Sequence, residues 1–216
     1  MERITIYVDG FNFYYGLKRQ KKIDRDWKKF YWIDFVKFFE HFVGINQILD
    51  KVVYFTASPL NIQKSSNQSA LLNANKLING NRFEVVRGKY YAKNIVCPSC
   101  QYAIQKPEEK RTDVNVAVRM IGDMVLGKTD IIVLVSADSD LVPPLEFIRD
   151  NYPEKKIKIH FPPSNFSFDL SNFTRRGKGK AIRLENNKLR FFNSIMPDTV
   201  TDGKESHTIP AKWKIP

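Results

Sequence analysis

The chain has 216 residues, 43% of them hydrophobic and 13% aromatic, a globular composition that excludes a disordered or collagen-like chain. This length suits one α/β domain with its own hydrophobic core. The formal net charge of +12 favours a polyanionic partner, nucleic acid above all, although a basic chain can also simply be a soluble one.

The first predicted element is a strand. Residues Ile4 to Val8 alternate in polarity and run into Asp9-Gly10-Phe11-Asn12, so the strand ends in an acidic residue followed by a turn. A short helix over Phe13 to Leu17 follows, and its start directs Asn12 toward the same edge. No signal peptide precedes the strand, and no apolar run approaches the ~18 residues of a membrane span. We expect a cytoplasmic protein without a membrane partner.

The next segment, Lys18 to Lys29, is a basic loop that carries Trp27. Such a charge run is typical of a solvated surface, although an aromatic ring among cations can also stack on a base. Apolar spacing in Ile33 to Val43 then predicts a helix with a wide buried face. After it come a strand over Lys51 to Thr56, a polar helix over Asn61 to Asn79 and a strand over Phe83 to Val86.

The segment Lys89 to Lys93 continues that strand or begins a hairpin arm that holds Cys97-Pro-Ser-Cys100. Two thiolates at this spacing are half of a tetrahedral zinc site. The chain has no other Cys, and His41, His160 and His207 lie far apart in the sequence. Zinc at Cys97 and Cys100 would need a second subunit, a distant histidine or water. A degenerate turn or a redox-sensitive thiol pair is the alternative.

Residues 112 to 125 predict a helix, because Val114, Ala117, Val118, Ile121 and Val125 form an apolar stripe at helical spacing. Thr112 is the candidate N-cap, which puts Asp113 in the first turn. There the helix dipole favours its charge and explains it without a binding site. Asp123 lies about 15 Å further along the axis, rotated by roughly 80°. We expect it not to share a site with Asp113.

The segment Ile131 to Asp140, IIVLVSADSD, is a run of apolar β-formers that ends in Ser-Ala-Asp-Ser-Asp. It predicts a strand buried on both faces of a parallel sheet. In open α/β sheets, ligands bind just beyond the carboxyl ends of the strands. Ser136, Asp138 and Asp140 therefore stand where a site is expected.

The remaining elements are a helix over Leu141 to Asn151, a strand over Lys156 to Phe161 and a short helix over Phe166 to Phe173. The densest basic patch follows, made of Arg175, Arg176, Lys178 and Lys180. The polar, Pro-containing residues 198–216 predict a flexible tail.

This order of elements predicts a mainly parallel sheet with helices on both faces. Asp9 and Asp138 end two of its strands, Asp140 lies in the same loop, and Asp113 begins the helix before the second strand. Four converging carboxylates repel one another unless a cation lies between them. Oxygen ligands suit Mg²⁺ or Mn²⁺ better than zinc, and such an ion beside a basic surface suits phosphodiester hydrolysis.

Three separated motifs, YVDGFNFYYGL, EKRTDVNVAVRMIGDMV and DIIVLVSADSDLVPPLEFIRD, closely resemble the NYN domains of the LabA-like branch, within the PIN-like nuclease superfamily. The resemblance covers about Met1 to Phe161, and the cysteine knuckle also occurs in relatives of this branch. It implies a PIN-like three-layer α/β/α sandwich and a metal-dependent ribonuclease site. By motif, the ligands of Mg²⁺ or Mn²⁺ would be Asp9, Asp113, Asp138 and Asp140, with Asn12 and Ser136 shaping the site by hydrogen bonding.

We therefore expect a nuclease domain over residues 1–161 with a knuckle insertion at 88–106, a basic extension over 162–197 packed on it, and a tail over 198–216. Candidate RNA contacts are Lys110, which could instead pair with one of the acids, and the basic patch Arg175, Arg176, Lys178 and Lys180.

The leading function is an RNA endonuclease. The alternatives are a catalytically silent RNA-binding or regulatory module, and another metal enzyme with Asp-x-Asp after a strand, such as a nucleotide-sugar transferase or a Toprim-type enzyme. The sequence leaves a homodimer open.

Overall fold

The computed structural model describes residues 1–177 and 179–214, with residues 92–94 and 105–109 described by their backbone. Its centre is a six-stranded sheet of order β3-β2-β1-β6-β7-β8. Every neighbouring pair in this sheet is parallel, which confirms the predicted parallel topology. The strands are β1 (Glu2–Asp9), β2 (Gln47–Thr56), β3 (Phe83–Arg87), β6 (Ile131–Val135), β7 (Lys156–Phe161) and β8 (Lys180–Arg183).

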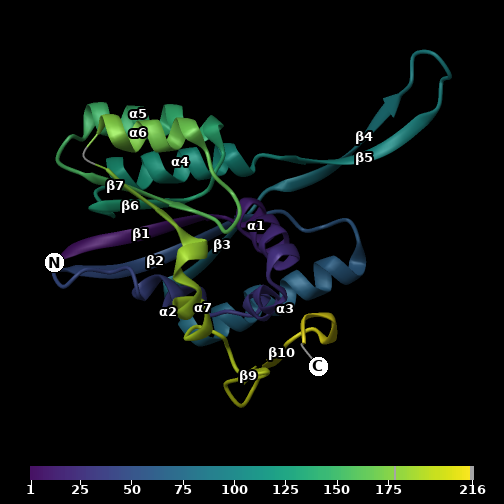
Figure 1. Cartoon of the computed structure of the whole chain (residues 1–216), viewed down its shortest axis with the longest axis horizontal. Coiled ribbons are helices and arrows are strands. Elements are labelled where there is room, and N and C mark those ends of the chain that lie inside the picture. The colour runs from purple at the N-terminus through teal and green to yellow at the C-terminus, as the bar shows by residue number, and fades with distance from the viewer. Residues whose placement is uncertain (178, 215–216) are drawn as a thin grey trace.

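Helices cover both faces of the sheet, so the fold is the predicted three-layer α/β/α sandwich (Figure 1). Successive residues of a strand point to opposite faces: Ile131 and Val133 join the core on one face, whereas Ile132 and Leu134 join the core on the other. The first face carries α1 (Gly10–Ile23), α2 (Phe35–Glu40), α3 (Ile62–Asn79) and α7 (Lys188–Phe192). The second face carries α4 (Thr112–Val125), α5 (Val142–Asn151) and α6 (Phe168–Arg176).

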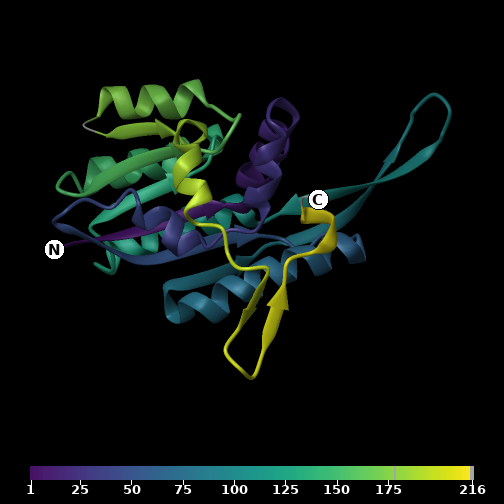
Figure 2. The same cartoon turned by 60° about the horizontal axis from the view of Figure 1, so that its bottom comes forward.

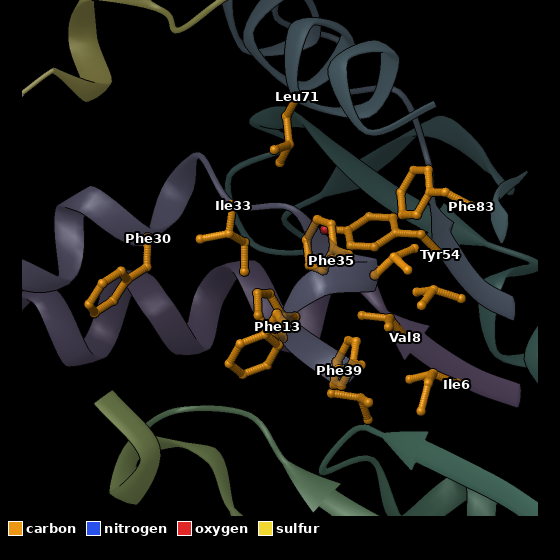
Figure 3. Close-up of a cluster of buried hydrophobic side chains, with 14 of the residues drawn as sticks. Ile6, Val8, Phe13, Phe30, Ile33, Phe35, Phe39, Tyr54, Leu71 and Phe83 are labelled. Carbon is orange, nitrogen blue, oxygen red and sulfur yellow. The ribbon is translucent and has the colours of Figure 1, made fainter. Parts of the chain in front are cut away.

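The first of these cores is largely aromatic. Figure 3 shows Phe13, Phe35 and Phe39 gathered beside Ile6 and Val8 of β1. The ring of Phe191 lies among four further rings, with centroid distances of 6.3, 5.1, 5.1 and 4.2 Å to Phe13, Trp27, Phe30 and Phe38. Because Phe191 comes from the C-terminal extension, that extension contributes to the main core.

The basic segment Lys18 to Lys29 is not a loop. Helix α1 continues to Ile23, and a 3-10 helix, η1 (Arg25–Tyr31), follows it. Trp27 is only 2% exposed, because its indole packs edge-on against Phe30 and Phe191. Trp27 therefore belongs to the core and is not placed to stack on a base.

The C-terminal third differs from the expected extension and flexible tail. Residues 180–183 form β8, which pairs with β7 as the sixth strand of the sheet. Residues expected in the tail form a hairpin of β9 (Thr199–Thr201) and β10 (Ser206–Thr208), followed by a 3-10 turn, η5 (Ala211–Trp213). Trp213 is buried against Tyr31, with ring centroids 5.7 Å apart. Apolar burial therefore anchors this segment to the body.

Residues 89–110 form an antiparallel hairpin of β4 (Lys89–Val96) and β5 (Ala103–Lys110). In both views this arm projects from the body of the molecule (Figures 1 and 2). Of the two predicted alternatives for Lys89 to Lys93, the hairpin arm is the one observed. Within the described part of the chain, no helix combines the length and the apolar composition that crossing a bilayer requires.

The position of Phe191 gives a test of whether the C-terminal third stabilises the domain. We expect Phe191→Ala to lower the free energy of unfolding by about 3 to 5 kcal/mol, because it removes a fully buried ring and leaves a cavity. Leu189→Ala, two residues earlier and 70% exposed, is the matched control, with an expected change of at most about 0.5 kcal/mol. Urea unfolding followed by tryptophan fluorescence measures both, and equal values would contradict the assignment of Phe191 to the core.

Candidate metal centre

Asp9 ends β1 and caps helix α1. Its Oδ1 accepts hydrogen bonds from the backbone N–H groups of Phe11 at 3.1 Å and Asn12 at 3.0 Å. Its Oδ2 accepts from Asn12 Nδ2 at 2.5 Å and from Ser136 Oγ at 2.8 Å. Four accepted hydrogen bonds match the capacity of a carboxylate, which is how this buried charge is accommodated.

Ser136 joins the end of β6 to the end of β1. While its hydroxyl donates to Asp9, the same oxygen accepts from the backbone N–H of Asp138 at 3.0 Å. The Asp138 carboxylate in turn accepts from the backbone N–H of Asp140 at 3.0 Å. Asp138 is therefore held at the carboxyl edge of the sheet beside Asp9.

Asp113 reaches the same edge from helix α4. Arg111, the residue before the helix, has a φ of 78°, a left-handed conformation that turns the chain from the arm into α4. The helix begins at Thr112, so the predicted N-cap is instead the first helical residue. Asp113 lies in the first turn, as expected.

Three carboxylates meet at this edge: Asp9, Asp113 and Asp138 each offer one oxygen, and these oxygens all lie within 4.8 Å of one another. Asp9 is buried, Asp138 is half-buried and Asp113 is exposed. Elsewhere in the described residues, no other group of three acidic, histidine or cysteine side chains converges in this way. Asp140, the fourth predicted acid, is not part of the trio.

The electrostatics of the trio favour a cation. Burial raises the pKa of Asp9, against the hydrogen bonds from Asn12 and Ser136 that lower it. Atoms crowded around the Asp113 carboxyl, and then the negative charges of Asp138, Asp9 and Asp140, raise its pKa to about 6. Asp140 thus adds charge to the site. A divalent ion would relieve this repulsion, and the all-oxygen donor set suits Mg²⁺ or Mn²⁺.

Asp123 lies outside the site, as its helical rotation predicts. Its carboxylate accepts hydrogen bonds from Tyr7 Oη at 3.0 Å and Arg119 Nε at 2.7 Å. It serves the packing of α4 on the sheet.

Two features of this edge are not predicted from the sequence. Asn165 Nδ2 donates to Asn12 Oδ1 at 2.5 Å, although no motif marks Asn165. The ring of Phe11 lies 6.3 Å from that of Tyr15 and 5.8 Å from that of Tyr90. The spacing of Phe11 and Tyr15, four residues apart on a helix, is the signal that would have indicated this aromatic cluster.

The predicted basic residues lie at two different edges. Lys110 ends β5 just before α4, close to Asp113. Lys180 begins β8 and pairs in register with Lys158, and it lines a cavity of about 1120 Å³ that Glu2 also lines. Glu2 begins β1 and Asp9 ends it, so this amino edge lies about 20 Å from the acids.

Arg175 and Arg176 form the last turn of α6, which leads into β8 at that amino edge. Lys178 lies outside the described residues. The described residues of the basic patch, Arg175, Arg176 and Lys180, therefore do not lie beside the acidic trio.

Cys97 and Cys100 are free thiols at the tip of the arm, at the opposite end of the hairpin from Lys110 and the acidic edge. The two candidate metal sites are separate.

Comparison with known proteins gives three matches. The sequence model of the NYN domain family matches residues 3–174. The chain is 30% identical over 196 residues to a 6-hydroxy-3-succinoylpyridine 3-monooxygenase from Pseudomonas putida, a match that covers 75% of this chain but only 60% of that protein. A protein of unknown function from Vibrio parahaemolyticus has a crystal structure with a TM-score of 0.52 and 18% identity, covering 84% of this chain and 93% of that one. This last likeness supports the fold alone.

The repulsion within the trio gives a prediction for stability. A carboxyl group whose pKa is raised by folding destabilises the folded state at pH 7, where it is ionised. Without divalent ions, we expect Asp113→Asn to raise the melting temperature by about 2 to 4 °C, which corresponds to about 1 kcal/mol for a domain of this size. With millimolar Mn²⁺ the order should reverse, because the wild type gains more from binding the ion.

Asp169→Asn is the matched control for this substitution, since Asp169 occupies the first turn of α6 as Asp113 does in α4. Its melting temperature should not rise, and Mn²⁺ should stabilise it as it does the wild type. Differential scanning fluorimetry measures all three proteins. If Asp113→Asn gained as much from Mn²⁺ as the wild type, Asp113 would not be a ligand.

Proposed function

The chain belongs to the NYN domain family, and on this premise we propose that it is a metal-dependent ribonuclease that cleaves RNA phosphodiester bonds internally. The observation that carries the proposal is the convergence of Asp9, Asp113 and Asp138 within 4.8 Å at the carboxyl edge of a parallel sheet, where α/β proteins bind their ligands. Three oxygen donors with mutual repulsion are suited to Mg²⁺ or Mn²⁺.

In this proposal Asp9, Asp113 and Asp138 hold the ion, which when bound polarises a phosphate and lowers the pKa of water. Asp9 already accepts four hydrogen bonds, so binding requires one donor to withdraw. The two backbone donors are fixed by α1, which leaves the side chains of Asn12 and Ser136. Each of these side chains has a second partner, since Asn12 Oδ1 accepts from Asn165 Nδ2 and Ser136 Oγ accepts from the backbone N–H of Asp138.

The surroundings of the trio suit an RNA strand. Arg87 ends β3 at the carboxyl edge, in register with Thr56, and Lys110 ends β5 beside the start of α4. These cations can contact backbone phosphates. Tyr15 is 44% exposed and stacks on Phe11, an arrangement that offers an aromatic face to an unpaired base. We therefore expect single-stranded RNA to be a better substrate than double-stranded RNA.

A cleavage assay tests the catalytic role of the trio. We expect the wild type to cleave labelled single-stranded RNA in the presence of Mg²⁺ or Mn²⁺, and EDTA to abolish this activity. Asp113→Asn should lower the cleavage rate by at least about 100-fold, because a ligand of the ion is lost, while a cooperative thermal transition shows that the variant is still folded. Asp169→Asn, with the same charge change at the same place in another helix, should retain activity.

Two outcomes would favour other functions. If the wild type and Asp113→Asn bind RNA equally and neither cleaves RNA or DNA, the chain is a silent RNA-binding or regulatory module. The Pseudomonas putida relative is named as a monooxygenase, so the second outcome is oxygen consumption on addition of 6-hydroxy-3-succinoylpyridine with a reductant. That result without nuclease activity would reject our proposal.

The basic residues at the carboxyl edge and at the amino edge of the sheet should contribute differently to RNA binding. We expect Lys110→Gln to weaken the binding of single-stranded RNA several-fold and to reduce the slope of log K against log salt by about 0.7, as the loss of one phosphate contact does. Lys180→Gln should leave both unchanged, because Lys180 lies at the amino edge. Fluorescence anisotropy at several salt concentrations measures both variants. A larger effect of Lys180→Gln than of Lys110→Gln would indicate that RNA binds along the basic patch.

A further inference from the structure

The arm exposes apolar surface for which the described residues show no cover. Its two strands pair in register from Lys89 with Lys110 to Val96 with Ala103, so it extends about 24 Å, and Figures 1 and 2 show it standing off the body. A two-stranded hairpin is marginally stable on its own. Its exposed apolar side chains are Tyr91, Ile95, Val96, Tyr102 and Ile104.

The turn at the tip is shaped as a metal knuckle. The backbone N–H of Cys97 donates to the Tyr102 carbonyl at 3.0 Å, and that of Gln101 donates to the Cys97 carbonyl at 2.9 Å. Gln101 has a φ of 55°, which closes the turn tightly after the second cysteine. Backbone N–H groups of Cys100 and Ser99 then donate to the Cys97 sulfur. Both cysteines therefore stand on one tight turn, as two ligands of a single tetrahedral ion do.

One chain supplies only half of the ligands that a structural zinc site needs. Such sites are tetrahedral, with four Cys or His ligands, and the chain has two Cys and three His. None of the histidines lies on the arm: His41 follows α2, His160 is within β7 and His207 is within β10. In the described residues, no third acidic, histidine or cysteine side chain joins Cys97 and Cys100.

We propose that the tip of the arm is half of a zinc site, which Cys97 and Cys100 of a second copy of this chain complete, so that one Zn²⁺ joins two chains tip to tip. Four thiols lose their protons when the ion binds, and no electrons are transferred. Exposed side chains beside the knuckle, such as Val96 and Tyr102, then lie where the partner's arm arrives. This site is independent of the acidic trio and of the proposed ribonuclease activity.

Metal stoichiometry and mass test the proposal together. Protein purified with a reductant is loaded with Zn²⁺, desalted and analysed by atomic emission and by light scattering coupled to gel filtration. We expect one zinc per two chains, a dimer that EDTA returns to the monomer, and thiols that react with a thiol reagent only after chelation. Replacement of zinc by Co²⁺ should give sulfur-to-cobalt charge-transfer absorption and the visible bands of a tetrahedral site.

Variants separate the tip from every other zinc ligand. Cys97→Ser with Cys100→Ser should lose the zinc, the cobalt spectrum and the dimer, while the melting temperature of the body changes little because the arm lies outside the core. Ser99→Ala is the control, since only the Ser99 backbone takes part, and it should keep all three. Asp113→Asn should also keep them, which excludes zinc bound at the acidic trio.

Several results would overturn the proposal. One zinc per chain would mean that a single copy completes the site, and zinc retained by the double cysteine variant would place it elsewhere. Reduced protein that takes up no zinc, or a Cys97–Cys100 disulfide as the stable form in the presence of reductant, would leave a redox pair. A dimer that persists after chelation would show that zinc is not what joins the two chains.

Discussion

The candidate metal centre depends on the parallel pairing of β1 with β6. Val8 and Val135 lie in register, so the residues that follow them, Asp9 and Ser136, leave the sheet at the same height. The hydrogen bond of 2.8 Å between Ser136 Oγ and Asp9 Oδ2 is the direct result. A shift of one residue in this register would direct the side chains to opposite faces, and the two strand ends would no longer share a site.

The same edge concentrates negative charge that the fold must tolerate. Asp9 is buried, and four hydrogen-bond donors stabilise its negative charge: two backbone N–H groups of α1, one side-chain amide and one hydroxyl. No cationic side chain donates to its carboxylate among the hydrogen bonds of the described residues. Asp113 and Asp138 add further negative charge, and after burial the charges of Asp138, Asp9 and Asp140 are what raise the pKa of Asp113. The repulsion between these carboxylates lowers the free energy of unfolding, and apolar packing elsewhere in the fold, including that around Phe191, offsets this loss.

Much of the fold and of the site follows from local sequence. The strand Ile131 to Val135 is recognisable because all five residues are apolar and β-forming, and the acids that meet at the edge each follow a strand or begin a helix. Asp140 shows the limit of such reasoning. Its negative charge helps to raise the pKa of Asp113, but its carboxylate is not among the three that converge. Trp27 shows a second limit. The charged residues around it predicted a solvent-exposed loop, although its side chain packs on Phe30 and Phe191.

The position of the basic patch could have been derived, once residues 180–183 are seen to be a strand. In a parallel α/β sheet, the chain returns through a helix from the carboxyl edge to the amino edge before the next strand begins. Arg175 and Arg176 end α6 just before β8, so topology alone places them opposite the acids. The strand itself was hard to predict from the sequence, because β8 has only the four residues Lys-Ala-Ile-Arg and contains no apolar run.

The arm and the acidic edge are joined through two contacts at the base of the hairpin. Lys110 ends β5, and Arg111 in its left-handed conformation connects it to α4, whose first turn carries Asp113. On the other strand, Tyr90 packs edge-on against Phe11, whose backbone N–H donates to Asp9. The base of the arm therefore borders two of the three carboxylates, whereas Cys97 and Cys100 lie at its far end, beyond the last paired residues of β4 and β5.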